Sequence, residues 1–233
     1  TGVAIDLEDG TKLTGSHLLV AAGRKPVTDG LNLDAAGIET DRGGIKTNEQ
    51  LRTTNKNVYA VGDVSGRGGL THAAGHHAGI IIKNFYFVPF FKASAETPNM
   101  PAVIYTQPEL ASIGLTESQA REKYGEVKAV HWEFEENDRA IASAQTTGLI
   151  KVMVVKGRPV GASIVGAQAG ELISLWALVL ANKMKMSAVA GMVAPYPTLG
   201  EINKRVAGAY FSPRLFDSPM VKRIVGFVQK ALP

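Results

Sequence analysis

Apolar and polar positions predict strands and one long helix in the first hundred residues. Residues 3–7 read as a strand, and Asp9-Gly10 is a hairpin turn signal between this strand and the polar-apolar run that follows it. Residues 17–22 read as a further short strand. Residues 58–61 form a short apolar run that fits a buried strand. A helix is predicted over residues 70–87. This part of the chain therefore reads as α/β.

The rest of the chain reads as an α+β unit. Pro89 and Pro98 bracket a short linker, which predicts a domain boundary near residue 98. Thr116 and Gln119 stand at the spacing of a capping box, so a helix starts there and ends before Gly125. Strands are predicted at residues 102–106, 127–134, 148–156 and 159–165, and further helices at 171–183 and 199–210.

The final segment, residues 219–230, has apolar residues at i, i+3, i+4 and i+7. Docking of this helix on the preceding domain is the favoured interpretation. Binding to a membrane surface is the alternative.

Composition narrows the class of protein. The 233 residues are 45% hydrophobic and 20% charged, an ordinary globular balance. No apolar stretch reaches the roughly 20 residues that a membrane span needs, and no basic-apolar signal segment opens the chain. A soluble cytoplasmic protein is expected. The net charge of +4 comes without aromatic-basic alternation, so no nucleic-acid surface is predicted.

Two short segments concentrate the candidate chemistry. Gly62 lets the backbone approach a ligand, and Asp63 would stand at the carboxyl end of the predicted strand, where open α/β sheets bind ligands. Upstream stands Ala21-Ala22-Gly23-Arg24-Lys25-Pro26. Spacing alone favours a simple turn or helix-cap carboxylate for Asp63.

Taken together, these two segments resemble those of the class I pyridine nucleotide-disulfide oxidoreductases. The chain resembles the C-terminal half of that family, including the stretches 101–109 and 161–166. The resemblance implies a partial FAD/NAD(P)-binding Rossmann-like domain followed by an α+β dimerisation domain. Residues 1–23 would end the NAD(P)-binding domain, residues 24–98 would belong to the FAD-binding domain, and residues 99–233 would form the dimer interface.

The same resemblance implies the cofactor, the partners and the binding residues. FAD would be bound in a homodimer that takes electrons from NAD(P)H and delivers them through FAD to a cysteine pair, and then to a small-molecule or disulfide acceptor. The start of the helix near residue 70 would point backbone N–H groups at the flavin ring. The implied FAD contacts are Gly23, Arg24, Gly62, Asp63, Leu70, Thr71, His72 and Ala73.

Parts of that machinery are missing from the sequence. The chain has no cysteine, and no Gly-x-Gly-x-x-Gly stands between a strand and a helix. We therefore expect a fragment of a longer enzyme that does not turn over by itself. Two alternatives stay open: a stand-alone dimerisation module, and a flavin reductase of the same fold whose acceptor is not a disulfide.

Tyr196 departs from the family. Where many members read His-Pro-Thr-x-x-Glu, this chain has Tyr196-Pro197-Thr198-Leu199-Gly200-Glu201. The family's histidine shuttles a proton in the partner's active site, which makes Tyr196 and Glu201 the catalytic candidates. A neutral tyrosine is a weak base at pH 7, so a packing role for Tyr196 and a first-turn charge for Glu201 stay open. Mercuric reductases also carry a tyrosine here, but they end in a cysteine pair that this chain lacks.

His72, His76 and His77 raise the question of a metal. The i, i+4 spacing of His72 and His76 puts them on one helix face, but two histidines without a third ligand make a poor zinc site. No metal site is predicted.

Overall fold

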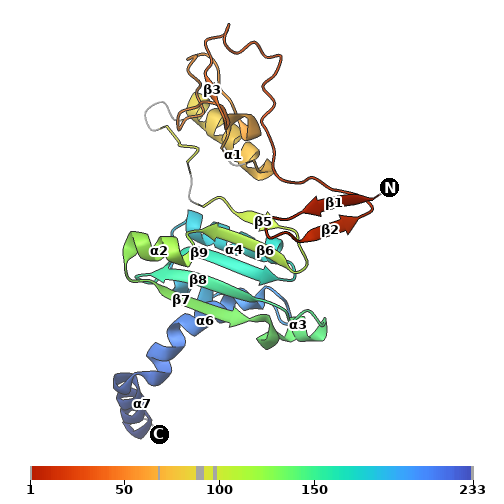
Figure 1. The fold of residues 1–233 in the computed structure, drawn as a ribbon. Coiled ribbons are helices and arrows are strands. Elements are labelled where there is room, and N and C mark those ends of the chain that lie inside the picture. The colour runs from red at the N-terminus through yellow and green to blue at the C-terminus, as the bar shows by residue number, and fades with distance from the viewer. Residues whose placement is uncertain (1, 68, 88–91, 97–98, 232–233) are drawn as a thin grey trace. The chain divides into compact units, whose positions relative to one another are not determined.

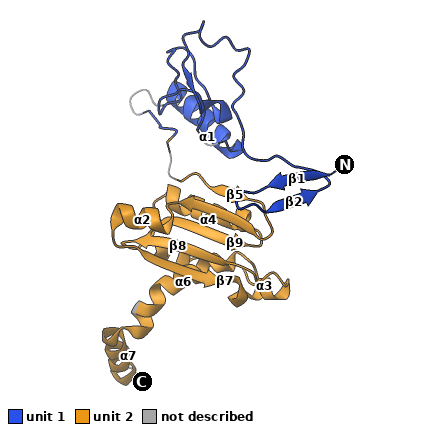
Figure 2. Ribbon diagram, in the orientation of Figure 1, with its two compact units in different colours: residues 1–95 blue, residues 96–233 orange. Residues whose placement is uncertain are grey.

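The computed structural model describes residues 2–67, 69–87, 92–96 and 99–231. They form two compact units, Thr1–Ala95 and Glu96–Pro233 (Figures 1 and 2). The division lies close to the predicted boundary near residue 98, although Pro89 and Pro98 themselves fall outside the described residues. Residues 1–23 and 24–95, assigned to different domains from the sequence, belong to one unit.

The first unit contains two small hairpins and one long helix. In the turn of the first hairpin, Asp9 Oδ1 accepts a hydrogen bond from the Thr11 N–H at 2.8 Å, as the Asp-Gly signal predicts. The helix predicted over residues 70–87 is present as an α-helix that continues directly into a short π-helix. The elements are β1 (Val3–Asp6), β2 (Lys12–Gly15), β3 (Thr40–Asp41), β4 (Gly44–Ile45), the 3-10 helix η1 (Gly62–Ser65), α1 (Thr71–Ile82) and the π-helix η2 (Lys83–Phe87).

Two strands predicted for this unit are wrong. Residues 17–22 are exposed and form no strand, and residues 58–61 form only an isolated bridge between Arg52 and Tyr59. A strand is stabilised by hydrogen bonds and side-chain pairs with its neighbours. The described part of this unit pairs strands only within the two hairpins, so these apolar runs have no ladder to join.

Two small apolar clusters fix the segment that leads to η1. Leu51, Ile80 and Ala95 pack together, which ties α1 to the chain before η1. The Ala60 N–H donates to the Leu51 carbonyl at 3.1 Å, and Ala60 packs with Ile45 in the second cluster. The backbone therefore enters η1 from a buried, hydrogen-bonded position.

The second unit is built on a five-stranded antiparallel sheet in the order β5-β6-β9-β8-β7 (Figure 1). Side chains along β8 point alternately to the two faces of this sheet, and both faces are packed. Ile150, Val152 and Val154 join the main core, whereas Met153 packs with Ala120 of α2. The strands are β5 (Ala102–Ile104), β6 (Glu109–Gly114), β7 (Lys128–Glu133), β8 (Leu149–Val155) and β9 (Arg158–Gly166).

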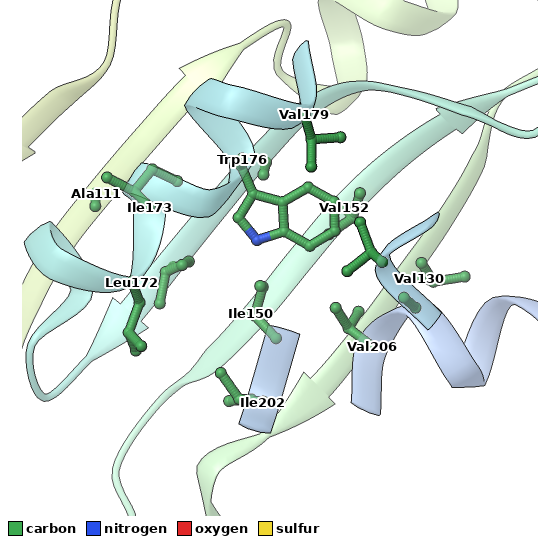
Figure 3. Close-up of a cluster of buried hydrophobic side chains, with 14 of the residues drawn as sticks. Ala111, Val130, Ile150, Val152, Leu172, Ile173, Trp176, Val179, Ile202 and Val206 are labelled. Atoms are coloured by element: carbon green, nitrogen blue, oxygen red, sulfur yellow. The ribbon is translucent and has the colours of Figure 1, made fainter. Parts of the chain in front are cut away.

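Helices α4 and α6 supply the other side of the main core. Trp176 of α4 lies among Ile150 and Val152 of the sheet and Val206 of α6 (Figure 3). Its buried indole N–H donates to Asn203 Oδ1 at 2.7 Å, which satisfies a polar group inside the core. The helical elements are α2 (Glu117–Tyr124), the 3-10 helix η3 (Phe134–Glu136), α3 (Asp138–Ala142), α4 (Ala169–Ala181), α5 (Met186–Ala190), α6 (Glu201–Ser212), the π-helix η4 (Pro213–Asp217) and α7 (Pro219–Ala231).

The elements predicted for this unit agree with the structure to within a few residues. The capping box is confirmed, because Gln119 N–H donates to Thr116 Oγ1 and Thr116 N–H donates to Gln119 Oε1. The pattern missed β6, α3 and α5. Both helices span only five residues, too short to show a helical period, and β6 mixes Glu109 and Ser112 with apolar residues.

The final helix, α7, has no buried residue. Across the part of the chain that the structure describes, every helix falls short of the length and apolar character that crossing a bilayer requires.

Candidate functional site

A tight turn at Gly62 is held against α1. Gly62 has φ +67°, a left-handed conformation that favours glycine, and a Cβ there would lie 3.0 Å from the Ala74 Cβ. Ser65 Oγ donates to the Gly62 carbonyl at 2.7 Å and closes the turn. The requirement for glycine thus comes from both backbone conformation and helix contact.

His77 completes the attachment of this turn. Its Nδ1 accepts the Gly62 N–H at 3.2 Å, and the side chain is buried. Nδ1 must therefore be unprotonated, so the ring is neutral. Burial, followed by the charges of His76 and Arg67, lowers the pKa of His77 below its usual value. From the sequence, His77 is a candidate only as a metal ligand, and no local pattern indicates its contact with Gly62.

Asp63 lies beside Arg24 at a surface pocket. Arg24 Nη2 and Asp63 Oδ2 are 3.8 Å apart, with side chains that are 81% and 47% exposed. An ion pair this exposed contributes little stability, which leaves the carboxylate open to a ligand. The pocket has a volume of about 500 Å³. It is lined by Arg24, Lys25, Pro26, Val27, Gly43, Asp63, Val64, Gly66 and Gly69.

The remaining predicted FAD contacts lie just before the pocket and at the start of α1. Gly23 is exposed with φ +137° and directly precedes Arg24. Leu70 is the N-cap residue of α1, and its side chain makes no capping hydrogen bond. Thr71 and His72 are exposed in the first turn, whereas Ala73 is buried. The first N–H groups of a helix lack intrahelical acceptors, so this end of α1 suits an anionic or electron-rich ligand.

The histidines of α1 were considered as metal ligands from their spacing. Among the described residues, no group of three or more potential ligands could hold an ion. His76 is exposed, and its ring centroid lies 6.4 Å from that of His77.

In the second unit, Tyr196 is hydrogen-bonded to a carboxylate that is not among the residues predicted from the sequence. The Tyr196 hydroxyl donates to Asp138 Oδ2 at 2.9 Å, and the side chain is 67% exposed. This hydrogen bond, followed by the charge of Asp138, raises the pKa of the Tyr196 phenol above its usual value. The phenol is thereby a weaker acid than a free tyrosine, so less phenolate is available to accept a proton at pH 7. The two residues are 58 positions apart, and no local pattern links them.

Glu201 is engaged by its own helix. It is the first residue of α6, and its Oε1 accepts from Arg205 Nε at 2.9 Å and Nη2 at 2.7 Å. This i, i+4 pair at a helix N-terminus is the arrangement expected of a structural first-turn carboxylate.

Comparison with known families explains both units. Residues 2–78 match the sequence model described as pyridine nucleotide-disulphide oxidoreductase. Residues 100–207 match the model of the dimerisation domain of the same family. The chain belongs to the pyridine nucleotide-disulphide oxidoreductase family. The resemblance stated from the sequence is thus confirmed.

Two individual relatives illustrate the match. The chain is 38% identical over 194 residues to a dihydrolipoyl dehydrogenase of Bacillus subtilis, which covers 82% of this chain and 41% of the relative. It is 34% identical over 192 residues to a mercuric reductase of Staphylococcus aureus, covering 81% of this chain and 35% of the relative. The chain thus spans about two fifths of the length of such relatives.

A solved structure supports the fold. The HOCl-induced flavoprotein disulfide reductase RclA from Escherichia coli matches 85% of this chain and 46% of its own with a TM-score of 0.78 and 27% identity. The predicted fold class, α/β followed by an α+β dimerisation domain of this oxidoreductase family, is confirmed.

Proposed function

We propose that this chain provides flavin-binding and subunit-joining parts of a cytoplasmic, homodimeric, FAD-dependent NAD(P)H oxidoreductase. The observation that carries the proposal is the Gly62 turn, which is fixed to α1 through His77 and presents Asp63 at a pocket beside Arg24. When bound, FAD would accept a hydride from NAD(P)H and pass electrons to a cysteine pair and then to an acceptor.

The residues around the pocket fit part of such a cofactor. Asp63 is half exposed and can accept hydrogen bonds from ligand hydroxyls. Gly66 and Gly69 line the pocket without side chains, whereas Gly62 is buried and supports the turn that presents Asp63. Arg24 supplies a cation that suits a pyrophosphate. We therefore assign the ribityl and pyrophosphate region of FAD to this pocket.

The start of α1 would complete the contact. The backbone N–H groups of Leu70, Thr71, His72 and Ala73 would face the flavin ring, where their partial positive charge favours added negative charge. Gly23 would let the chain bend next to Arg24.

The domain assignments follow the same proposal. Residues 1–23 would end the NAD(P)-binding domain, residues 24–98 would belong to the FAD-binding domain, and residues 99–233 would form the homodimer interface. The family models fall on either side of the second boundary.

The electron acceptor of the complete enzyme would be either a disulfide or a non-disulfide group. The relatives include a dihydrolipoyl dehydrogenase, a mercuric reductase and a disulfide reductase. Tyr196 stands where many members have a proton-shuttling histidine, and its phenol already donates to Asp138. A same-fold reductase with a non-disulfide acceptor is therefore the second candidate. In it, Tyr196 would line the acceptor pocket or pack there, and Glu201 would only stabilise α6.

The flavin assignment is tested by Asp63→Ala in the complete protein. Loss of the Asp63 carboxylate removes a hydrogen-bond acceptor and leaves ligand hydroxyls unpaired, at a cost of about 1–3 kcal/mol. FAD should therefore bind about 5- to 150-fold more weakly. Flavin stoichiometry after purification and a Kd from apoprotein titration measure the effect. The control is Asp29→Ala, which removes an exposed carboxylate that does not line the pocket. It should change neither the flavin stoichiometry nor the Kd. An Asp63→Ala protein that retains full, tightly held flavin would refute the assignment.

A further inference from the structure

The helix α7 is strongly two-sided and exposed. It spans Pro219–Ala231, follows the π-helix η4, and has no buried residue. Met220 and Phe227 are 71% and 73% exposed. Large apolar side chains on a helix of a globular protein normally face a core. Here they lie on the surface of the described structure.

The helical period separates the two faces of α7 cleanly. At about 100° per residue, the apolar side chains fall within an arc of about 160°. The basic residues and Gln229 occupy the opposite arc. The apolar arc contains Met220, Val221, Ile224, Val225, Phe227, Val228 and Ala231.

The polar face of α7 carries only positive charge. Lys222, Arg223 and Lys230 lie on it, and the helix contains no Asp or Glu. The nearest acidic residue, Asp217, ends the preceding π-helix. A cationic face opposite an apolar arc containing phenylalanine is the arrangement of helices that lie in the plane of an anionic membrane surface.

We propose that α7 binds anionic lipid surfaces, with Phe227 and Ile224 in the acyl boundary and Lys222, Arg223 and Lys230 at the headgroups. The long basic side chains flank the apolar arc, so their charges reach the surface while the helix lies flat. Each basic residue near an anionic surface adds attraction that neutral lipid cannot supply.

Charge favours lipid over a second copy of this chain as the occupant. Pairing two α7 helices through their apolar faces would bring together helices that carry only cations, with no acidic residue on either to meet them. The region matched by the dimerisation model ends at residue 207, so α7 lies outside it. The proposal does not depend on flavin binding and would survive failure of the Asp63 test.

Vesicle co-sedimentation of the 233-residue chain tests the proposal. We expect binding to vesicles that contain phosphatidylglycerol, little binding to pure phosphatidylcholine, and loss of binding as salt is raised. Lys222→Gln should weaken binding about fivefold. Phe227→Gln should weaken it about tenfold or more. The matched control, Gln229→Ala on the polar face, should bind like the unaltered chain.

Helix orientation gives a second readout, because the chain has no cysteine to compete for a label. A polarity-sensitive dye on Phe227→Cys should shift to shorter wavelength with anionic vesicles and resist an aqueous quencher. The same dye on Gln229→Cys should stay in water. Neither substitution touches a buried residue, so the fold of the second unit is kept.

Several results would overturn the proposal. These are no association with anionic vesicles, equal association with neutral ones, an unaltered affinity in Phe227→Gln, or equal dye responses at the two positions. If Phe227→Gln instead separates dimers in the absence of lipid and no vesicle binding occurs, the apolar face belongs to a second copy.

Discussion

Replacing His77 by leucine removes the acceptor that the Gly62 N–H uses. His77 is 2% exposed, and its Nδ1 lies 3.2 Å from the Gly62 nitrogen. Leucine is also bulky but cannot accept a hydrogen bond. A buried N–H left unpaired costs about 1–3 kcal/mol, which is about 5- to 150-fold in the equilibrium for opening the turn.

Hydrogen exchange measures this opening directly. The Gly62 amide should exchange about 5- to 150-fold faster in His77→Leu when closing outpaces exchange. Tryptophan fluorescence would not report it, because Trp132 and Trp176 both lie in the second unit. His76→Leu changes the adjacent, exposed histidine and should leave Gly62 protection intact. Equal protection in His77→Leu and the unaltered chain, or equal loss in both variants, would refute the role given to His77.

The same contact makes the turn sensitive to acid. The pKa of His77 is lowered in the folded chain, whereas the unfolded value is about 6.5. Below that pH the unfolded state binds more protons, so the stabilisation is present above about pH 6.5 and is lost as pH falls through the lowered folded value. His77→Gln, whose amide oxygen can accept the Gly62 N–H without titrating, should flatten this dependence. An unchanged acid dependence in His77→Gln would assign it to other groups.

Three further outcomes are expected. Tyr196→Phe in the complete enzyme should lower turnover by about tenfold or less, since only a hydrogen bond is lost; a fall of several orders of magnitude would make the phenol an essential acid–base group. Asn203→Ala should destabilise the second unit by about 1–3 kcal/mol in urea unfolding, because the Trp176 N–H loses its acceptor; a change below about 0.5 kcal/mol would contradict this. Residues 99–233 should sediment as a dimer at micromolar concentration, and a monomer would count against the proposed interface.

Local patterns were sufficient for much of the second unit. The Thr116 capping box, the predicted strands near β7, β8 and β9, and the helix near α4 depend on residues close together in sequence, and the structure has them close to their predicted positions. The segments around Arg24 and Asp63 were recognisable for the same reason, and the structure brings these two residues together. Their role in flavin binding stays a prediction.

The sequence by itself determined the family, the order of elements in the second unit and the residue types at the Gly62 turn. Each of these features depends on residues that are close together in the sequence. Only the tertiary structure decided which distant groups meet. It paired Tyr196 with Asp138 across 58 positions and His77 with Gly62 across 15. It also gave residues 58–61 no neighbouring strand beyond an isolated bridge. A strand depends on hydrogen-bonding partners that its own sequence does not specify.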